Sequence, residues 1–213
     1  MKIGVFDSGI GGAAVVEELR RLIPDAVVIS ANDHEHVPYG GRPRSEIMQL
    51  TRAAVQPLIA MQCDVIVIAC NTATTAAIQL LRHDFPTQKF VGLEPMVKPA
   101  AALTKTKKVA VLATPATLQS PRYAQLKDEW AKDVTFFEPD CSSWAERIEN
   151  GDAEKISLET TLQPLLNEGV DVIVLGCTHY HWLKVRIESI VGETVTVLEP
   201  SNAIKNRIVE IVA

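Results

Sequence analysis

Short apolar runs alternate with amphipathic stretches along most of this chain. Each run is a few residues long, rich in Val and Ile, and bounded by polar or turn-forming residues, which is the pattern of a strand buried on both faces of a sheet. The runs predict strands at residues 3–6, 27–30, 65–69 and 90–93 in the first half, and at 108–113, 134–137, 172–175 and 194–198 in the second.

Between these runs, apolar residues recur at three- and four-residue spacing, which is the period of an amphipathic helix. The pattern predicts helices at residues 13–22, 45–61, 74–82, 183–191 and 203–212. Strands that alternate with helices form parallel sheets covered on both faces. The chain is therefore expected to have an α/β fold.

The chain also repeats its own pattern after about 106 residues. The segment DVIVIAC at residues 64–70 returns as DVIVLGC at residues 171–177. Three further pairs keep the same order and nearly the same offset, namely 2–8 with 108–114, 26–33 with 134–141, and LEP at 93–95 with LEP at 198–200. We therefore expect two duplicated, flavodoxin-like domains related by pseudo-twofold symmetry, one formed by residues 1–97 plus 205–213 and the other by residues 98–204.

Composition removes several classes of protein from consideration. The chain has 213 residues, of which 47% are hydrophobic and 22% charged, with a formal net charge of −5. That balance favours an ordinary globular protein with no nucleic-acid or membrane partner. A predicted strand follows directly on Met1-Lys2, without the apolar stretch of a signal peptide, so we expect a cytoplasmic protein. In a reducing compartment the 4 cysteines are not a disulfide framework.

Polar residues gather where the predicted strands end. Ligands of open parallel sheets bind beyond the carboxyl ends of the strands. Pseudo-twofold symmetry would turn both sets of strand ends toward one cleft, with Cys70 and Cys177 facing each other, and we expect the active site there. The residues at these ends are Asp7, Ser8, Cys70, Asn71, Thr72, Glu94, Thr114, Cys177, Thr178, His179 and Glu199.

Two opposed thiols suit the inversion of a stereocentre. One group removes a proton on one face of the carbon, and a second delivers a proton on the other. A thiol, with a reference pKa of roughly 8.5, serves as either acid or base near neutrality. Each cysteine precedes a predicted helix whose N-terminus would stabilise a thiolate. We predict Cys70 and Cys177 as the catalytic pair, with Asp7 and His179 orienting or activating a thiol or holding a substrate ammonium.

Other interpretations stay open beside this one. A cysteine at a strand end is often only a small hydrophobic residue, and Cys63 and Cys141 are interpreted in that way. His34, His36, Cys177, His179 and His181 include zinc-ligand types, but their spacing matches no standard zinc pattern. The glycine turn at 7–12 is not a dinucleotide fingerprint. A decarboxylase or isomerase using one cysteine, or a protein that binds an anion without chemistry, would also fit the fold.

The motifs, taken in order, resemble those of the glutamate racemase family within the wider aspartate/glutamate racemases. They are DSGIGG at 7–12, Asp33 five residues before PYG at 38–40, CNTA at 70–73, TxxTxxSxxY from Thr114 to Tyr123, and GCTHY at 176–180. The resemblance runs from residue 1 to about residue 212. It implies interconversion of L- and D-glutamate for peptidoglycan synthesis, without pyridoxal phosphate or metal. Aspartate is the second choice of substrate, and a homodimer is left open.

The resemblance also implies roles for individual residues. Cys70 and Cys177 would be the acid/base pair. Substrate contacts would come from Asp7, Ser8, Tyr39, Gly40, Asn71, Thr72, Thr178 and His179, with Asp33, Glu149, Thr114 and Thr117 in support. The chain departs from the family pattern in the charged segment His34-Glu35-His36 before Pro38, and at His181, where proline is usual.

Overall fold

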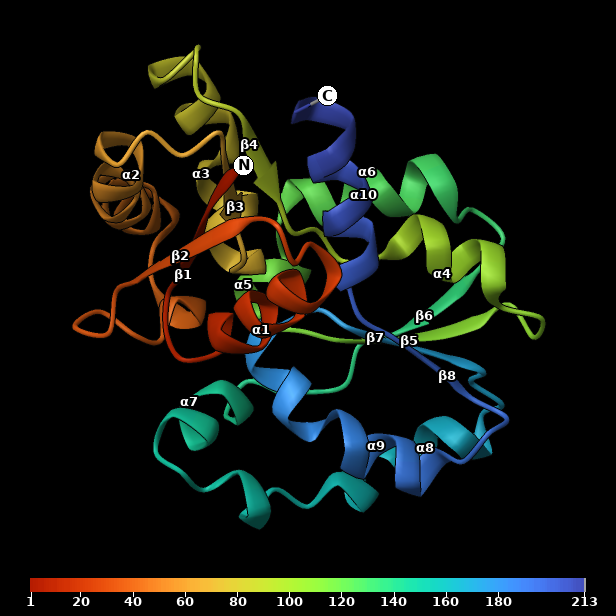
Figure 1. Ribbon diagram of the computed structural model, residues 1–213. Helices are drawn as coiled ribbons and strands as arrows, with labels where there is room; N and C mark the ends of the chain where they lie inside the picture. The colour runs from red at the N-terminus through yellow and green to blue at the C-terminus, as the bar shows by residue number, and fades with distance from the viewer. Residues whose placement is uncertain (213) are drawn as a thin grey trace. The chain divides into compact units, whose positions relative to one another are not determined.

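The structure is a computed structural model that describes residues 1–212, and the chain divides into two α/β units (Figure 1). The first unit is Met1–Glu94 together with the segment from Pro200 onward, and the second is Pro95–Glu199. The sequence places the corresponding domain limits at 97/98 and 204/205, and these limits stay a prediction. Among the helices of residues 1–212, none combines the length and apolar composition needed to cross a bilayer.

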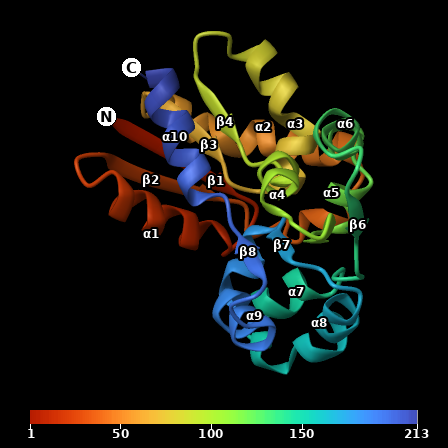
Figure 2. The same ribbon diagram turned by 90° about the vertical axis from the view of Figure 1, so that its right-hand side faces the viewer.

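The first unit is built on a parallel sheet with strand order β2-β1-β3-β4. Side chains alternate across it: Phe6, Ile66 and Ile68 pack in one core cluster, and Val5 and Val67 pack in another. Helices α2 and α3 cover the first face, and α1 and α10 cover the second (Figure 2). The elements are β1 (Lys2–Asp7), α1 (Gly12–Leu22), β2 (Val27–Asn32), the 3-10 helix η1 (Tyr39–Gly41), α2 (Arg44–Ala60), β3 (Val65–Ile68), α3 (Asn71–Asp84), β4 (Phe90–Gly92) and α10 (Ser201–Val212).

The second unit repeats this topology, with a parallel sheet in the order β6-β5-β7-β8. Strand by strand, β5 to β8 take the positions that β1 to β4 hold in the first sheet, so the duplication predicted from the sequence is present in the topology. The elements are α4 (Val97–Leu103), β5 (Lys108–Leu112), α5 (Pro115–Leu118), α6 (Pro121–Trp130), β6 (Thr135–Phe137), α7 (Trp144–Glu149), η2 (Ala153–Lys155), α8 (Leu158–Asn167), β7 (Val172–Leu175), η3 (Thr178–Leu183), α9 (Lys184–Val191) and β8 (Thr196–Leu198).

The predicted α/β fold with parallel sheets is confirmed. The differences lie at element ends and in five helices, α4 to α8, that the sequence pattern did not predict. The helix expected from residue 74 begins at Asn71, because Cys70 caps it. The helix expected from residue 183 is preceded by the 3-10 helix η3, which starts directly after Cys177.

Candidate active site

The carboxyl edge of the first sheet gathers the polar residues that were expected there. Strand β1 ends at Asp7, and β3 ends two residues before Cys70. Because β1 and β3 are paired in parallel, both ends lie at the same edge. The segments that follow the two strands keep their polar side chains buried, namely Asp7, Ser8, Asn71 and Thr72. This edge is therefore a polar site inside a mostly apolar unit.

The glycine turn at this edge wraps around Asp7. The Oδ2 atom of Asp7 accepts hydrogen bonds from the backbone N–H groups of Gly9 at 3.1 Å and Gly12 at 3.0 Å. A Cβ atom at position 12 would lie 2.4 Å from the Cβ of Asp7, so only glycine fits there. The turn into α1 thus places a carboxylate at the N-terminus of the helix and satisfies two backbone N–H groups.

Cys70 caps helix α3. Its Sγ accepts from the backbone N–H of Ala73 at 3.4 Å and from the hydroxyl of Ser8 at 3.3 Å. Both bonds point donors at sulfur, and the helix N-terminus adds a favourable dipole, so the surroundings favour a thiolate. Burial works in the opposite direction, since the residue is 6% exposed.

Asn71 carries a polar atom for which the described residues supply no partner. Its Oδ1 atom is buried without a hydrogen bond from any residue in 1–212, although the residue is only 4% exposed. An unpaired buried carbonyl oxygen costs about 1–3 kcal/mol. Such an oxygen, next to Cys70, is suited to accept a hydrogen bond from a bound donor such as an ammonium group.

In the second unit, a thiol, an imidazole and a carboxylate form a chain. The Sγ of Cys177 lies 3.6 Å from Nδ1 of His179, and Nε2 of His179 contacts a carboxylate oxygen of Glu149. His179 is 3% exposed. The carboxylate fixes the ring, and the ring nitrogen lies within hydrogen-bonding distance of the sulfur, so this arrangement suits acid/base chemistry at Cys177.

Glu149 is held in this position by packing between α7 and η3. The rings of Trp144 and Tyr180 meet edge-on with centroids 5.3 Å apart, and the hydroxyl of Tyr180 donates to the carbonyl of Cys141 at 2.8 Å. Burial raises the pKa of Tyr180 well above its usual value, with a further contribution from Cys177. The phenol therefore remains a neutral donor that anchors the segment before α7.

The two cysteines differ in what stabilises them. The expectation that a helix N-terminus supports each thiol holds for Cys70, which accepts from the first turn of α3. It is wrong for Cys177, because η3 makes no cap bond to its side chain and α9 begins only at Lys184. His179 supplies the partner instead.

The remaining candidate residues of the second unit lie at the carboxyl end of β5 and after β7. Thr114 is the N-cap residue of α5 and donates from its hydroxyl to that of Thr117 at 3.1 Å, and both residues are buried. Thr178, next to Cys177, is buried as well. These hydroxyls line the same edge as Cys177, because β5 and β7 are parallel neighbours.

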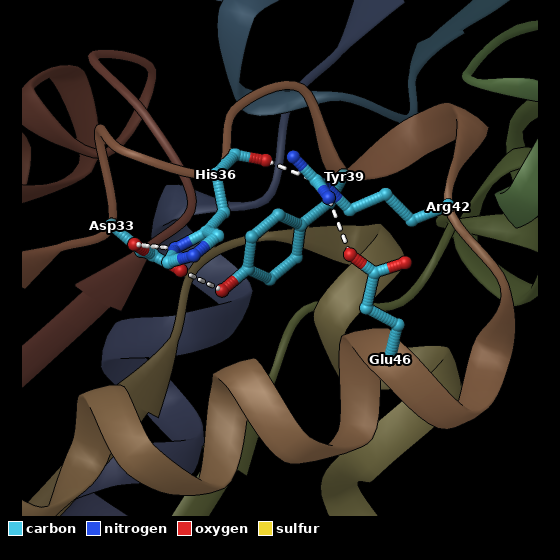
Figure 3. Close-up of polar contacts among 5 residues, drawn as sticks. All are labelled: Asp33, His36, Tyr39, Arg42 and Glu46. Atoms are coloured by element: carbon cyan, nitrogen blue, oxygen red, sulfur yellow. Dashed lines mark hydrogen bonds and ion pairs between the residues drawn. The ribbon is translucent and has the colours of Figure 1, made fainter.

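Asp33 and Tyr39 form a separate contact in the first unit (Figure 3). The Tyr39 hydroxyl donates to Oδ2 of Asp33 at 2.7 Å, and the ring is 1% exposed. Burial raises the pKa of Tyr39 far above its usual value, and the hydrogen bond to Asp33 adds to the effect. The phenol is thus a fixed donor, and Gly40 follows it directly in η1.

The other two cysteines are buried without such partners. Burial raises the pKa of Cys141 to about 12, and the pKa of Cys63 is also raised by burial. Both therefore remain thiols, as the structural interpretation of the sequence requires. Within residues 1–212, no three His, Cys, Asp or Glu side chains converge in the manner of a metal site.

Three comparisons relate this chain to known proteins. The family described as Asp/Glu/Hydantoin racemase matches residues 12–206. The glutamate racemase of Ectopseudomonas mendocina (strain ymp) is 40% identical over 210 residues, which covers 97% of this chain and 80% of that protein. The crystal structure of Escherichia coli glutamate racemase in complex with L-glutamate and the activator UDP-MurNAc-ala has a TM-score of 0.85 at 31% identity, covering 99% of this chain and 82% of that one.

A further solved structure agrees with these. Glutamate racemase from Francisella tularensis subsp. tularensis SCHU S4, in complex with D-glutamate, has a TM-score of 0.82 at 27% identity and covers 99% of this chain and 80% of its own. The resemblance inferred from the motifs is confirmed by sequence and by fold. The chain belongs to the Asp/Glu/Hydantoin racemase family.

Proposed function

We propose that this protein interconverts L- and D-glutamate by exchanging protons between the substrate's alpha carbon and two thiols, those of Cys70 and Cys177, without a cofactor. One observation carries the proposal. In each unit, a single buried cysteine follows the strand at the same position in the sheet, β3 in one and β7 in the other, and each has a hydrogen-bonding partner suited to acid/base work.

The chemistry balances with these two groups alone. One cysteine, as thiolate, takes the alpha proton and leaves the electron pair on the alpha carbon, where the neighbouring carboxylate delocalises it. The other cysteine, as thiol, donates its proton to the opposite face and becomes the thiolate. The enzyme then carries the reverse pair of protonation states, so it is ready for the other enantiomer. The reaction is an isomerisation with no net redox change.

The surroundings of each sulfur support one half of this cycle. Ser8 and the first turn of α3 donate to Cys70 and stabilise its thiolate form. His179, held by Glu149, accepts or returns the proton of Cys177. We propose that Asn71 accepts from the substrate ammonium through its unpaired Oδ1.

The remaining candidate residues are proposed to complete the pocket around the substrate. Asp7, Ser8, Tyr39, Gly40, Thr72, Thr178 and His179 would contact it, while Asp33, Glu149, Thr114 and Thr117 hold those residues in place. Asp7 already accepts two backbone N–H groups through one oxygen, which keeps the carboxylate oriented before any ligand arrives.

Glutamate is proposed as the substrate because the similar enzymes are glutamate racemases and two similar structures hold L- and D-glutamate. D-Glutamate made in this way would supply peptidoglycan synthesis. The mechanism requires both thiols to stay reduced, so we retain the cytoplasmic location as part of the proposal.

The test uses the purified chain in deuterated, metal-free buffer. Starting from either enantiomer, we expect circular dichroism to show racemisation and NMR to show deuterium entering the alpha position. Cys70→Ala and Cys177→Ala should each lower the rate of racemisation by at least about 10²-fold, the usual contribution of one acid/base group. Cys63→Ala, at a buried cysteine outside the site, is the matched control. Per folded molecule, it should racemise glutamate at the same rate as the unaltered protein.

Two outcomes would contradict the proposal. Full racemase activity in either Cys70→Ala or Cys177→Ala would show that one cysteine is enough, as a one-thiol enzyme requires. Absence of racemisation with glutamate, alongside turnover of aspartate under the same conditions, would leave the fold and the family intact but exclude glutamate as the substrate.

A further inference from the structure

The segment between β2 and α2 carries a set of side-chain contacts of which the proposed function uses only Asp33 and Tyr39. We call it the Asp33 network, formed by Asp33, His36, Tyr39, Arg42 and Glu46 (Figure 3). It runs from the end of β2 to the first turn of α2 and surrounds the residues that lead into Tyr39 and Gly40.

Asp33 is the centre of the network, because each of its oxygens has its own partner. Oδ1 lies 2.7 Å from Nδ1 of His36, and Oδ2 accepts from the Tyr39 hydroxyl at 2.7 Å. The raised pKa of Tyr39 keeps its hydroxyl protonated, so the phenol is the donor to Asp33. An ionised carboxylate only accepts hydrogen bonds, so in its contact with Asp33 the Nδ1 atom of His36 carries the proton. The imidazole thus prevents rotation of the carboxylate that fixes the phenol.

His36 is itself fixed from two sides. Its backbone N–H donates to the carbonyl of Asp33 at 3.2 Å, which closes a turn, and its carbonyl accepts from Nε of Arg42 at 2.7 Å. The guanidinium of Arg42 also pairs with Glu46 on α2. The turn that places the His36 imidazole beside Asp33 is therefore connected to α2 through Arg42 and Glu46.

Tyr39 connects this network to the reacting edge of the unit. Its ring packs 6.4 Å from that of Phe6, in the same buried cluster as Ile68 and Cys70. A shift of the phenol would move the backbone of Tyr39 and Gly40 relative to Cys70. Displacements of about 1 Å at a site of this kind cost up to about 10²-fold in activity.

We propose that His36 is a positioning residue: by donating from Nδ1 to Asp33, it holds Tyr39, and with it the Tyr39-Gly40 backbone beside Cys70, in the geometry that binds the substrate. The inference rests on the proposed function for glutamate as that substrate and for its contact with Tyr39 and Gly40. The sequence marked His36 only as part of a charged segment and as a zinc-ligand type, because its contact with Asp33 depends on the turn that brings the ring back.

The test removes the Nδ1 donor of His36 in one variant and places an amide donor at two different positions in two others. The amide of Asn places a nitrogen where Nδ1 of histidine lies, whereas the amide of Gln reaches the position of Nε2. We expect His36→Ala and His36→Gln to raise KM for glutamate by about tenfold or more, the equivalent of losing one hydrogen bond to a charged group, with kcat within about threefold. His36→Asn should restore KM to within about twofold of the unaltered protein.

His34→Ala is the matched control, since His34 is an exposed histidine of the same segment and should leave KM unchanged. A residue that only stabilised the fold would lower the urea midpoint in all three His36 variants and leave KM of the folded protein alone. That result, or equal KM values for His36→Asn and His36→Gln, would overturn the inference.

A second readout separates failure of this inference from failure of the proposed function. In the ¹H–¹⁵N spectrum, the Nδ1 proton of His36 should be protected from exchange, and Asp33→Ala, which removes the acceptor, should abolish that protection. If the unaltered protein does not racemise glutamate, the proposed function fails while the spectrum still tests the contact. If the Nδ1 proton exchanges freely in a fully active enzyme, the inference alone fails.

Discussion

A single added methyl group at position 12 tests how strictly the first turn of α1 is built around Asp7. In Gly12→Ala, the new Cβ would start 2.4 Å from the Cβ and 3.3 Å from the Cγ of Asp7. Carbon atoms in favourable contact are about 3.5–4.0 Å apart, so the two groups must separate by more than about 1 Å. Asp7 is 2% exposed, and a shift of its side chain away from position 12 would break its hydrogen bonds to the N–H groups of Gly9 and Gly12.

The cost follows from those contacts. Overpacking of this kind costs about 1–3 kcal/mol. Loss of one N–H bond from Gly9 or Gly12 to the carboxylate adds about 1.5–3 kcal/mol. The better helix propensity of alanine offsets at most about 1 kcal/mol. We therefore expect Gly12→Ala to lower the free energy of unfolding by about 2–4 kcal/mol.

Urea unfolding followed by circular dichroism measures this change. With m unchanged, the midpoint should fall by about 1–2 M. Racemase activity of the folded fraction should fall as well, because Asp7 is displaced. Gly41→Ala is the control: its Cβ would meet nothing within 4 Å, and its stability should stay within about 0.5 kcal/mol of the unaltered protein. A Gly12→Ala protein with an unaltered midpoint would refute the steric argument.

Two further predictions concern the second unit. Glu149→Gln removes the carboxylate that fixes His179 and should lower kcat by about 10–10³-fold with little change in KM. Glu146→Gln, on the exposed face of the same helix, is the control and should leave kcat unchanged. Equal kcat values for the two variants would argue against a role of the Glu149–His179 contact in catalysis. At Asp171, burial acts to raise the pKa, but bonds from Thr104 and the N–H groups of Lys105 and Thr106 outweigh it, so the pKa is lowered. A carboxyl group of lowered pKa stabilises the fold above its unfolded value of roughly 3.9 and loses that contribution as the pH falls through the folded value. The stability difference between the unaltered protein and Asp171→Asn, measured by urea unfolding, should therefore be constant from about pH 5 to 7 and shrink below about pH 4; a difference that does not change with pH would contradict this.

The sequence by itself determined the fold class, the duplication and the family. These depend on local periodicity and on segments that repeat in order, such as 64–70 and 171–177, and both are readable without knowing any contact. It also singled out Cys70 and Cys177, because a strand end is defined by local pattern and the carboxyl ends of parallel strands share one edge.

The tertiary structure alone decided which groups surround each sulfur and how they are held. Nothing in the spacing of Glu149 and His179 shows that a carboxylate meets the imidazole, since their contact depends on the packing of α7 against η3. The pairing of His36 with Asp33 is likewise set by a turn and by Arg42. Periodicity records which face of an element is buried, whereas the direction of a hydrogen bond depends on backbone and side-chain angles that only packing fixes.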